Sequence, residues 1–170
     1  MNVIDAICRR RSIRRYKETV VEQKKLDRIL EAARLAPSAA NKQPWRFIVI
    51  ADPEAKEKLR PSYNVNWFIQ APVIIVACGV PKEAWHRRDG EEYCKVDVAI
   101  AMQNLVLAST ELGLGTCWIA AFDEKRVKKA LGIPKDVKVV AMSPLGYPDE
   151  KRGPITERKP IDEIVSYNHW

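Results

Sequence analysis

The sequence is poor in the residues that bind metal ions or build disulfide frameworks. Its 170 residues include four cysteines and two histidines. The cysteines form no C-x-x-C pair, and no spacing between cysteine and histidine matches a zinc site. Cys8, Cys78 and Cys117 stand among apolar neighbours and are expected to be small core residues. We therefore expect neither a metal site nor a disulfide-dependent fold.

Long hydrophobic stretches are absent as well. The longest apolar run, residues 71–80, is interrupted by Gly79 and is far shorter than a membrane-spanning helix. No apolar segment typical of a signal peptide follows the N-terminal arginines. We therefore expect no membrane association, and a reducing cytoplasm as the compartment.

Glycine is scarce, with seven residues, and its spacing argues against a dinucleotide-binding fold. Gly113 and Gly115 have no third glycine, and they follow a predicted helix instead of standing between a strand and a helix. This excludes a Rossmann loop, so a nicotinamide would have no binding fold of its own in this chain.

What the sequence does contain is an ordinary globular composition with an excess of positive charge. It is 46% hydrophobic and 30% charged, which predicts a single domain over residues 1–170. The 29 lysines and arginines exceed the 22 acidic residues and give a net charge of +7. This excess is concentrated at residues 9–15 and 151–159, and no nucleic-acid-binding motif accompanies it. We therefore expect an anionic small-molecule ligand and no nucleic-acid partner.

Hydrophobic periodicity predicts an α+β fold in which a central helix packs on a sheet. The central helix covers residues 96–112, where small alanines among larger apolar residues favour burial on more than one side. The expected helices cover residues 3–10, 21–35, 53–59, 96–112 and 124–131, and the expected strands cover residues 47–50, 73–78, 116–119 and 137–142. Residues 155–170 are unusually apolar for a chain end, which favours docking on a partner subunit.

Two polar clusters lie within the first 45 residues. Residues 9–15 contain five arginines and a serine, a composition that suits a phosphate. Residues 36–45 combine proline, serine, asparagine and glutamine, whose amides and hydroxyl suit a polar heterocycle. Each cluster has a structural alternative: the arginines can form a solvated basic turn, and Ser38 and Asn41 can cap helix ends and turns.

With further segments, these clusters resemble the FMN-binding nitroreductase family. The resemblance rests on the following segments, which occur in this order along the chain: Arg10-Arg11-Ser12-Ile13-Arg14, the P-S-x-x-N-x-Q-P-W pattern of residues 37–45, residues 113–119 with Phe122, Gly146-Tyr147-Pro148, and Arg158-Lys159-Pro160. It implies an α/β/α sandwich around a mixed, mostly antiparallel sheet. It also implies a homodimer with a domain-swapped C-terminal tail and FMN at each subunit interface.

The resemblance assigns roles to individual residues. It places Arg10, Arg11 and Ser12 at the FMN phosphate, with Arg158 from the C-terminal segment. It places Arg14 near the N1–C2=O edge, where a fixed cation stabilises the charge gained on reduction. At the ring, it implies Asn64 at the N3/O4 edge, with Asn66 as the alternative. Pro37, Ser38 and Ala39 would pack on the ring from the partner subunit, and Asn41 is a further cofactor-binding residue. The backbone of Trp118, Ile119 and Ala120 is implied at N5 and O4. Both Trp45 and Trp118 are expected to belong to the core.

The implied activity is that of an NAD(P)H-dependent FMN oxidoreductase. NADH or NADPH would reduce the flavin, and a small nitroaromatic or quinone acceptor would then oxidise it in a ping-pong cycle. No side chain is assigned a catalytic role, because the flavin carries the chemistry. The alternatives are a non-enzymatic FMN-binding redox sensor, and reductive dehalogenation or flavin fragmentation, which would call for an added substrate lid. Residues 80–93 are too short for an obvious lid, and His86 within them is expected to be solvated.

Overall fold

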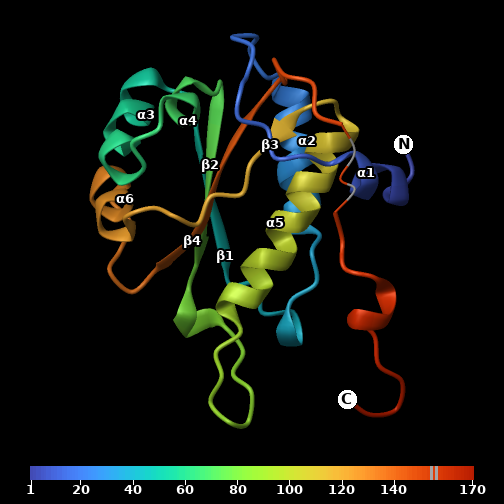
Figure 1. Ribbon diagram of the computed structural model, residues 1–170. Helices are drawn as coiled ribbons and strands as arrows, with labels where there is room; N and C mark the ends of the chain where they lie inside the picture. The colour runs from blue at the N-terminus through green and yellow to red at the C-terminus, as the bar shows by residue number, and fades with distance from the viewer. Residues whose placement is uncertain (154, 156) are drawn as a thin grey trace.

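A computed structural model describes residues 1–153, 155 and 157–170, and it shows an α+β sandwich (Figure 1). Helices α1, α2 and α5 lie on one side of the central sheet, and α3, α4 and α6 lie on the other. The helices are α1 (Val3–Arg9), α2 (Gln23–Arg34), α3 (Pro53–Leu59), α4 (Asn66–Gln70), α5 (Cys94–Glu111) and α6 (Glu124–Leu131). The strands are β1 (Trp45–Ile50), β2 (Val73–Gly79), β3 (Gly115–Thr116) and β4 (Lys138–Gly146).

The four strands are hydrogen-bonded in the order β1-β2-β4-β3, and each neighbouring pair is antiparallel. An isolated parallel bridge joins Ser12 to Thr116 beside β3. Strand β2 is buried along its whole length because helices cover both of its faces. Its side chains alternate between two cores: Ile75 and Ala77 pack with α2 and α5, whereas Ile74 and Val76 pack with α3, α4 and α6.

Helix starts follow the capping residues in the sequence. The side chains of Asn2, Asp52 and Asp123 accept hydrogen bonds from backbone N–H groups in the first turns of α1, α3 and α6. Gly113 has a φ of 76°, a left-handed conformation typical of the glycine that follows a helix, and it comes after the end of α5. The sequence therefore predicted these helix boundaries to within a few residues.

Several elements differ from the expectation. The strand predicted over residues 116–119 is interrupted: β3 ends at Thr116, and the chain pairs with β4 again only at Ile119, through an isolated bridge to Met142. Strand β4 continues beyond Met142 to Gly146, because Val73 and Ile75 of β2 pair with its last residues. Helix α4 was not predicted; it has five residues and buries Phe68 and Ile69.

Two single-residue predictions were wrong. Cys8 is exposed on α1, whereas Cys78 and Cys117 are buried as predicted. The side chain of Trp118 is 41% exposed and is not part of the core, whereas Trp45 is buried. Both corrections have the same cause: an apolar residue beside other apolar residues need not face the core, since neighbours in sequence point in different directions.

Gly115 allows the N-terminal segment to approach the sheet closely. A Cβ atom at this position would lie 2.7 Å from Cγ1 of the buried Ile13. We expect Gly115→Ala to lower the free energy of unfolding by about 1–3 kcal/mol, because the added methyl group overpacks this contact. Urea unfolding measures the effect. The matched control is Gly153→Ala, where nothing lies within 4 Å, and equal loss in both variants would contradict the expectation.

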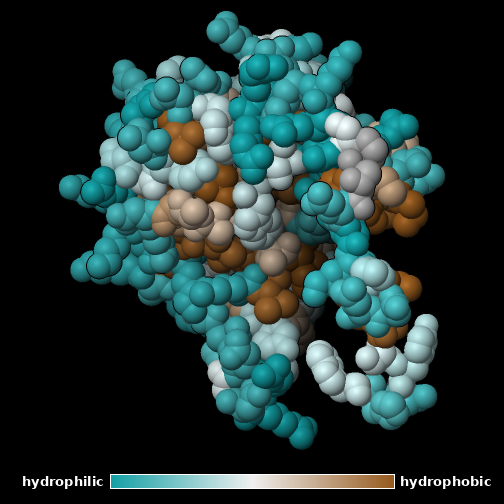
Figure 2. All heavy atoms as spheres, viewed as in Figure 1, coloured by the Kyte–Doolittle hydropathy of each residue, from teal (hydrophilic) through white to brown (hydrophobic). Residues whose placement is uncertain are grey.

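The C-terminal tail runs along one side of α5 and stands apart from the body of the molecule (Figure 2). It contains five exposed large hydrophobic residues: Ile161, Ile164, Val165, Tyr167 and Trp170. Within the predicted docking segment, Thr156 lies outside the described residues. None of the helices that the structure describes is long and apolar enough to cross a membrane. The described residues also contain no group of three potential metal ligands among Cys, His, Asp and Glu.

Candidate functional site

Residues 12–17 lie along the end of the sheet that β3 and the last residues of β4 form. The N–H of Ile13 donates to the carbonyl of Thr116 at 2.9 Å, and the N–H of Lys17 donates to that of Tyr147 at the same distance. The hydroxyl of Tyr16 donates to the carbonyl of Ile13, and burial raises the pKa of this phenol. The segment is therefore held at both ends by backbone hydrogen bonds and internally by Tyr16.

The side chains of this extended segment alternate between two sides. Ile13 packs on Gly115, whereas Ser12 and Arg14 lie beside the buried thiol of Cys117. Burial raises the pKa of this thiol, although the nearby charge of Arg14 acts in the opposite direction. Ser12 and Arg14 thus share one face, as the cofactor hypothesis requires.

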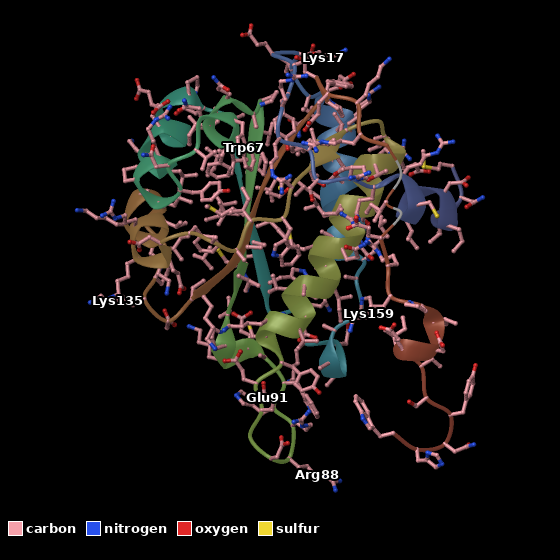
Figure 3. All side chains as sticks on the ribbon, viewed as in Figure 1. Lys17, Trp67, Arg88, Glu91, Lys135 and Lys159 are labelled. Atoms are coloured by element: carbon pink, nitrogen blue, oxygen red, sulfur yellow. The ribbon has the colours of Figure 1, made fainter. Side chains whose placement is uncertain are left out.

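The guanidinium of Arg14 is positioned by contacts that leave its charge uncompensated. Its Cζ atom lies 5.9 Å from the ring centroid of Trp67, which comes from α4 at the upper end of the sheet (Figure 3). Within the described part of the chain, no carboxylate oxygen lies within 4.0 Å of its nitrogens. Its backbone N–H instead donates to Oε1 of Glu150 at 2.6 Å. The fixed cation thus remains available to an anion.

Glu150, which follows strand β4, fixes the position of the segment 12–17. Its second oxygen accepts a hydrogen bond from Arg152 at 2.8 Å. Desolvation raises the pKa of Glu150, but the hydrogen bonds from the Arg14 backbone and from Arg152 outweigh it and hold the pKa below its ordinary value. The carboxylate is therefore charged near neutral pH, and it fixes the backbone of Arg14 without neutralising its side chain.

The remaining arginines of the cluster do not share one surface. Arg10 is half-buried at the C-terminal end of α1. Arg11 lines a cavity of about 310 Å³ together with Arg9, Arg152 and Glu150. Neither Arg10 nor Arg11 forms an ion pair within the residues that the structure describes. Both cations suit a phosphate, but Arg11 lies on the Ile13 side of the segment, apart from Ser12 and Arg14.

Residues 118–120 follow Cys117 and run past this site. Ile119 exchanges both of its backbone hydrogen bonds with Met142, at 2.9 and 3.0 Å. The backbone N–H groups that this stretch can offer to a ligand are therefore those of Trp118 and Ala120, whose residues are exposed. Of the three residues predicted here, Ile119 serves the sheet.

Asn64 precedes α4 and is exposed. Its alternative, Asn66, accepts a hydrogen bond from Arg60 at 2.8 Å. Because Trp67 on the same segment contacts Arg14, both asparagines lie on the chain segment that flanks the cationic side of the site. Asn66 is engaged within the protein, which favours Asn64 as the ligand-binding residue.

The second predicted cluster forms a tight turn around the 3-10 helix Ala39–Asn41. Ala40, Asn41 and Gln43 all have positive φ values, of 48°, 53° and 50°. Such conformations cost free energy in residues other than glycine and often occur at functional sites. Within the turn, the hydroxyl of Ser38 accepts from the N–H of Gln43 at 2.9 Å, and the side chain of Gln43 donates to Oδ1 of Asn41 at 3.0 Å. The N–H of Ala39 donates to Oδ1 of Asp97 at 2.9 Å and ties the turn to α5. Ser38 therefore has the turn-capping role that was its structural alternative.

The two predicted halves of the site lie at opposite ends of α5 (Figure 1). The turn contacts Asp97 in the first turn of this helix, whereas Ser12 pairs with Thr116 beyond its last residue. From Asp97 to Glu111 the helix rises by roughly 20 Å, at 1.5 Å per residue. A single chain therefore does not bring residues 12–14 and residues 37–41 together.

Arg158 is exposed on the tail, where its side chain donates to the carbonyl of Glu157 at 2.7 Å. Figure 3 shows the next residue, Lys159, on the tail beside α5. In the described residues no hydrogen bond joins Arg158 to the Arg10–Ser12 segment. The chain thus leaves this predicted phosphate ligand separate from the others.

Comparisons with known proteins identify the family of this chain. The family model described as "Nitroreductase family" matches residues 7–64 and 60–147. The chain belongs to the nitroreductase family. An NADH dehydrogenase from Thermus thermophilus is 32% identical over 191 residues, covering 94% of this chain and 93% of that protein. A nitroreductase family protein from Clostridium difficile 630 superposes with a TM-score of 0.90 at 32% identity, with all of both chains covered. An FMN-dependent nitroreductase from another strain of that species gives a TM-score of 0.81 at 32% identity, covering 98% of this chain and 99% of that one.

Membership of the nitroreductase family confirms the resemblance, the fold and the oxidoreductase class expected from the sequence. Residues 85–93 form a hairpin that projects beyond the sheet, with Arg88 and Glu91 near its tip (Figure 3). His86 pairs with Glu92 through a backbone bridge, and its side chain is exposed as predicted.

Three residues that shape the candidate site were missed in the sequence. Glu150 holds the Arg14 backbone, Trp67 contacts the Arg14 guanidinium, and Asp97 holds the turn. Asp97 had a visible signal, because it is an isolated acid between the apolar residues 96 and 98 of the central helix. Glu150 and Trp67 gave no such signal, since both stand among ordinary polar or aromatic neighbours.

Proposed function

We propose that the chain forms a homodimer that binds FMN at each of two subunit interfaces and transfers electrons from NADH or NADPH to a small acceptor. The observation that carries this proposal is the separation of the two half-sites by α5. Each half-site suits a different part of FMN, and they can close on one molecule only if one chain supplies the cations and the other supplies the turn. Four unpaired cysteines suit the cytoplasm as the compartment.

Exposed apolar surface supports the dimer. Val3, Ile4 and Ile7 of α1 and Val96 and Ile100 of α5 are exposed in the single chain, as are the five large hydrophobic residues of the tail. Surface of this kind and extent is characteristic of subunit interfaces. We propose that the tail crosses to the partner and carries Arg158 to the phosphate that Arg10, Arg11 and Ser12 bind.

The donor set fits FMN. Arg10, Arg11, Ser12 and Arg158 supply cationic and hydroxyl donors for a phosphate. Arg14 supplies the charge at the N1–C2=O edge, Asn64 an amide for the N3/O4 edge, and Trp118 and Ala120 backbone N–H groups for the N5 side. Pro37, Ser38, Ala39 and Asn41 of the second chain would cover the ring from the other direction.

When bound, FMN would supply the redox chemistry, namely transfer of electrons from NADH or NADPH to a small acceptor such as a nitroaromatic or a quinone in separate half-reactions. The chain's own task is binding and electrostatics. Arg14 stabilises negative charge at N1, the polar clusters orient the ring, and the two subunits limit the access of water to it.

An absorbance spectrum tests the proposed function directly. We expect the purified protein, or the protein reconstituted with FMN, to show flavin bands that bleach on anaerobic addition of NADH or NADPH and return when a quinone is added. A protein that binds FMN but is reduced slowly by both donors would instead favour a redox sensor. A protein that cannot be loaded with FMN would refute the proposal.

A further inference from the structure

Among the residues that the structure describes, Asp97 is the only buried charged residue, with 1% of its surface exposed. It lies in the first turn of α5, where the helix dipole favours an acidic residue. The next residue of the helix, Val98, is fully buried in the core shared with α2 and β2. A carboxylate at such a position is costly unless its contacts compensate for lost hydration.

The contacts of Asp97 point to the turn at residues 37–43. Oδ1 accepts the hydrogen bond from the N–H of Ala39 at 2.9 Å. Oδ2 is also buried, and it has no hydrogen-bond partner within the described chain. No lysine or arginine of that same part forms an ion pair with either oxygen. The bond to Ala39 is thus the interaction that the structure gives to this buried acid.

Ala39 stands where the backbone enters its run of left-handed residues. Ser38 before it is extended, with φ −139° and ψ 156°, and Ala40 and Asn41 after it have positive φ values. Because none of these residues is glycine, the turn needs external contacts to keep this conformation. Inside the turn, Gln43 donates hydrogen bonds to Ser38 and Asn41, and the bond that the N–H of Ala39 donates to Asp97 ties the turn to the central helix.

We propose that Asp97 is a positioning residue for the flavin site, acting through the N–H of Ala39 to fix the turn that covers the ring. The proposal rests on the proposed function, in which this turn contacts the FMN bound mainly by the other subunit. A side-chain oxygen of residue 97 accepts the Ala39 N–H, and the helix sets the position of this acceptor relative to the sheet. The central helix therefore supports the ring-covering half of the site from inside the fold.

The test measures FMN affinity in variants of the whole protein by titrating the apoprotein with FMN. We expect Asp97→Ala to weaken FMN binding at least about tenfold, a common size of effect when a residue supporting a bound group is lost. Asp97→Asn keeps an oxygen acceptor for the Ala39 N–H and is expected to retain affinity within about threefold of the wild type. The matched control is Val98→Ala, a buried neighbour on α5 that leaves the turn's hydrogen bonds intact.

A second variant removes the same bond from the other side. Ala39→Pro deletes the donating N–H, and the extended conformation of Ser38 is the one that a residue before proline adopts. If the two residues act through one bond, the double variant Asp97→Ala/Ala39→Pro loses no more affinity than the worse single variant. If Asp97→Ala does not fold, Ala39→Pro and Asp97→Asn still test the proposal.

The outcomes separate this proposal from the proposed function. Wild-type protein that fails to bind FMN refutes both, whereas wild-type binding with unchanged affinity in Asp97→Ala or Ala39→Pro overturns only the role of Asp97. Hydrogen exchange of the apoprotein gives an independent readout: amides of residues 39–43 are expected to exchange faster in Asp97→Ala and at the wild-type rate in Val98→Ala. Equal rates in all variants would show that Asp97 does not hold the turn.

Discussion

Mixing two variants that cannot hold FMN alone is expected to restore about a quarter of the wild-type flavin content, the statistical yield for a two-fold symmetric dimer with a composite site. The variants are Arg10→Glu, which reverses charge at the phosphate, and Pro37→Trp, which fills the space for the ring. In the mixed dimer both substitutions fall in one of the two FMN sites, so the other site contains wild-type residues at both positions. The two variants are unfolded, mixed and refolded in excess FMN. The absorbance of the bound flavin then measures the recovery.

Each variant refolded by itself serves as the control for this experiment. Pro37 is exposed in the single chain, so its replacement leaves the two cores unchanged. A mixture that stays colourless, although size measurements show mixed dimers, would place both half-sites on one subunit. Normal flavin binding by Pro37→Trp alone would remove the turn from the site.

Arg14→Ala is expected to lower the reduction potential of bound FMN by at least about 30 mV, the shift that corresponds to a tenfold change for a two-electron couple. The guanidinium has no carboxylate partner within the described residues, so its full charge is available to stabilise the reduced flavin. Its loss disfavours the anionic reduced form and therefore makes the flavin harder to reduce. Spectroscopic titration against a reference dye measures the potential.

Neighbouring variants isolate the position of the charge. Arg14→Lys keeps a cation and should retain most of the potential. Arg15→Ala removes the same charge, but the side chain of Arg15 lies against Asp149, with Nε 2.8 Å from the Asp149 carbonyl. An equal fall in potential for Arg15→Ala would show that the effect comes from the net charge of the protein and not from the position of Arg14. An unchanged potential in flavin-loaded Arg14→Ala would exclude the proposed role.

The fold was predictable where local rules decide it. Cap residues such as Asn2 and Asp123 gave the helix starts, and the apolar run of β2 gave a strand covered on both faces. Prediction failed where distant segments decide the outcome. The strand after α5 pairs with Ser12 and Ile13, which are far away in sequence, as well as with β4. Helix α4 is too short to show a period, and its formation depends on the burial of Phe68 and Ile69.

The site shows the same division between local and distant information. The side chains of Ser12 and Arg14 were predictable because they belong to one short motif that sits on one extended segment. The support for Arg14 was not predictable, since Glu150 and Trp67 come from other regions of the chain. Nor could the sequence show that Met142 occupies both backbone groups of Ile119. The role of Arg11 at the phosphate stays a prediction, and its side chain lines a cavity beside Arg9 and Arg152.

The length of α5 has a consequence for how the cofactor is retained. In the proposed dimer, the 18-residue helix keeps the two half-sites of each chain too far apart to bind the same FMN molecule. A single subunit therefore makes only part of the contacts that hold FMN. Cofactor release and subunit dissociation then become one linked equilibrium. Dilution alone should strip the flavin, and excess FMN should hold the subunits together at concentrations where the apoprotein separates.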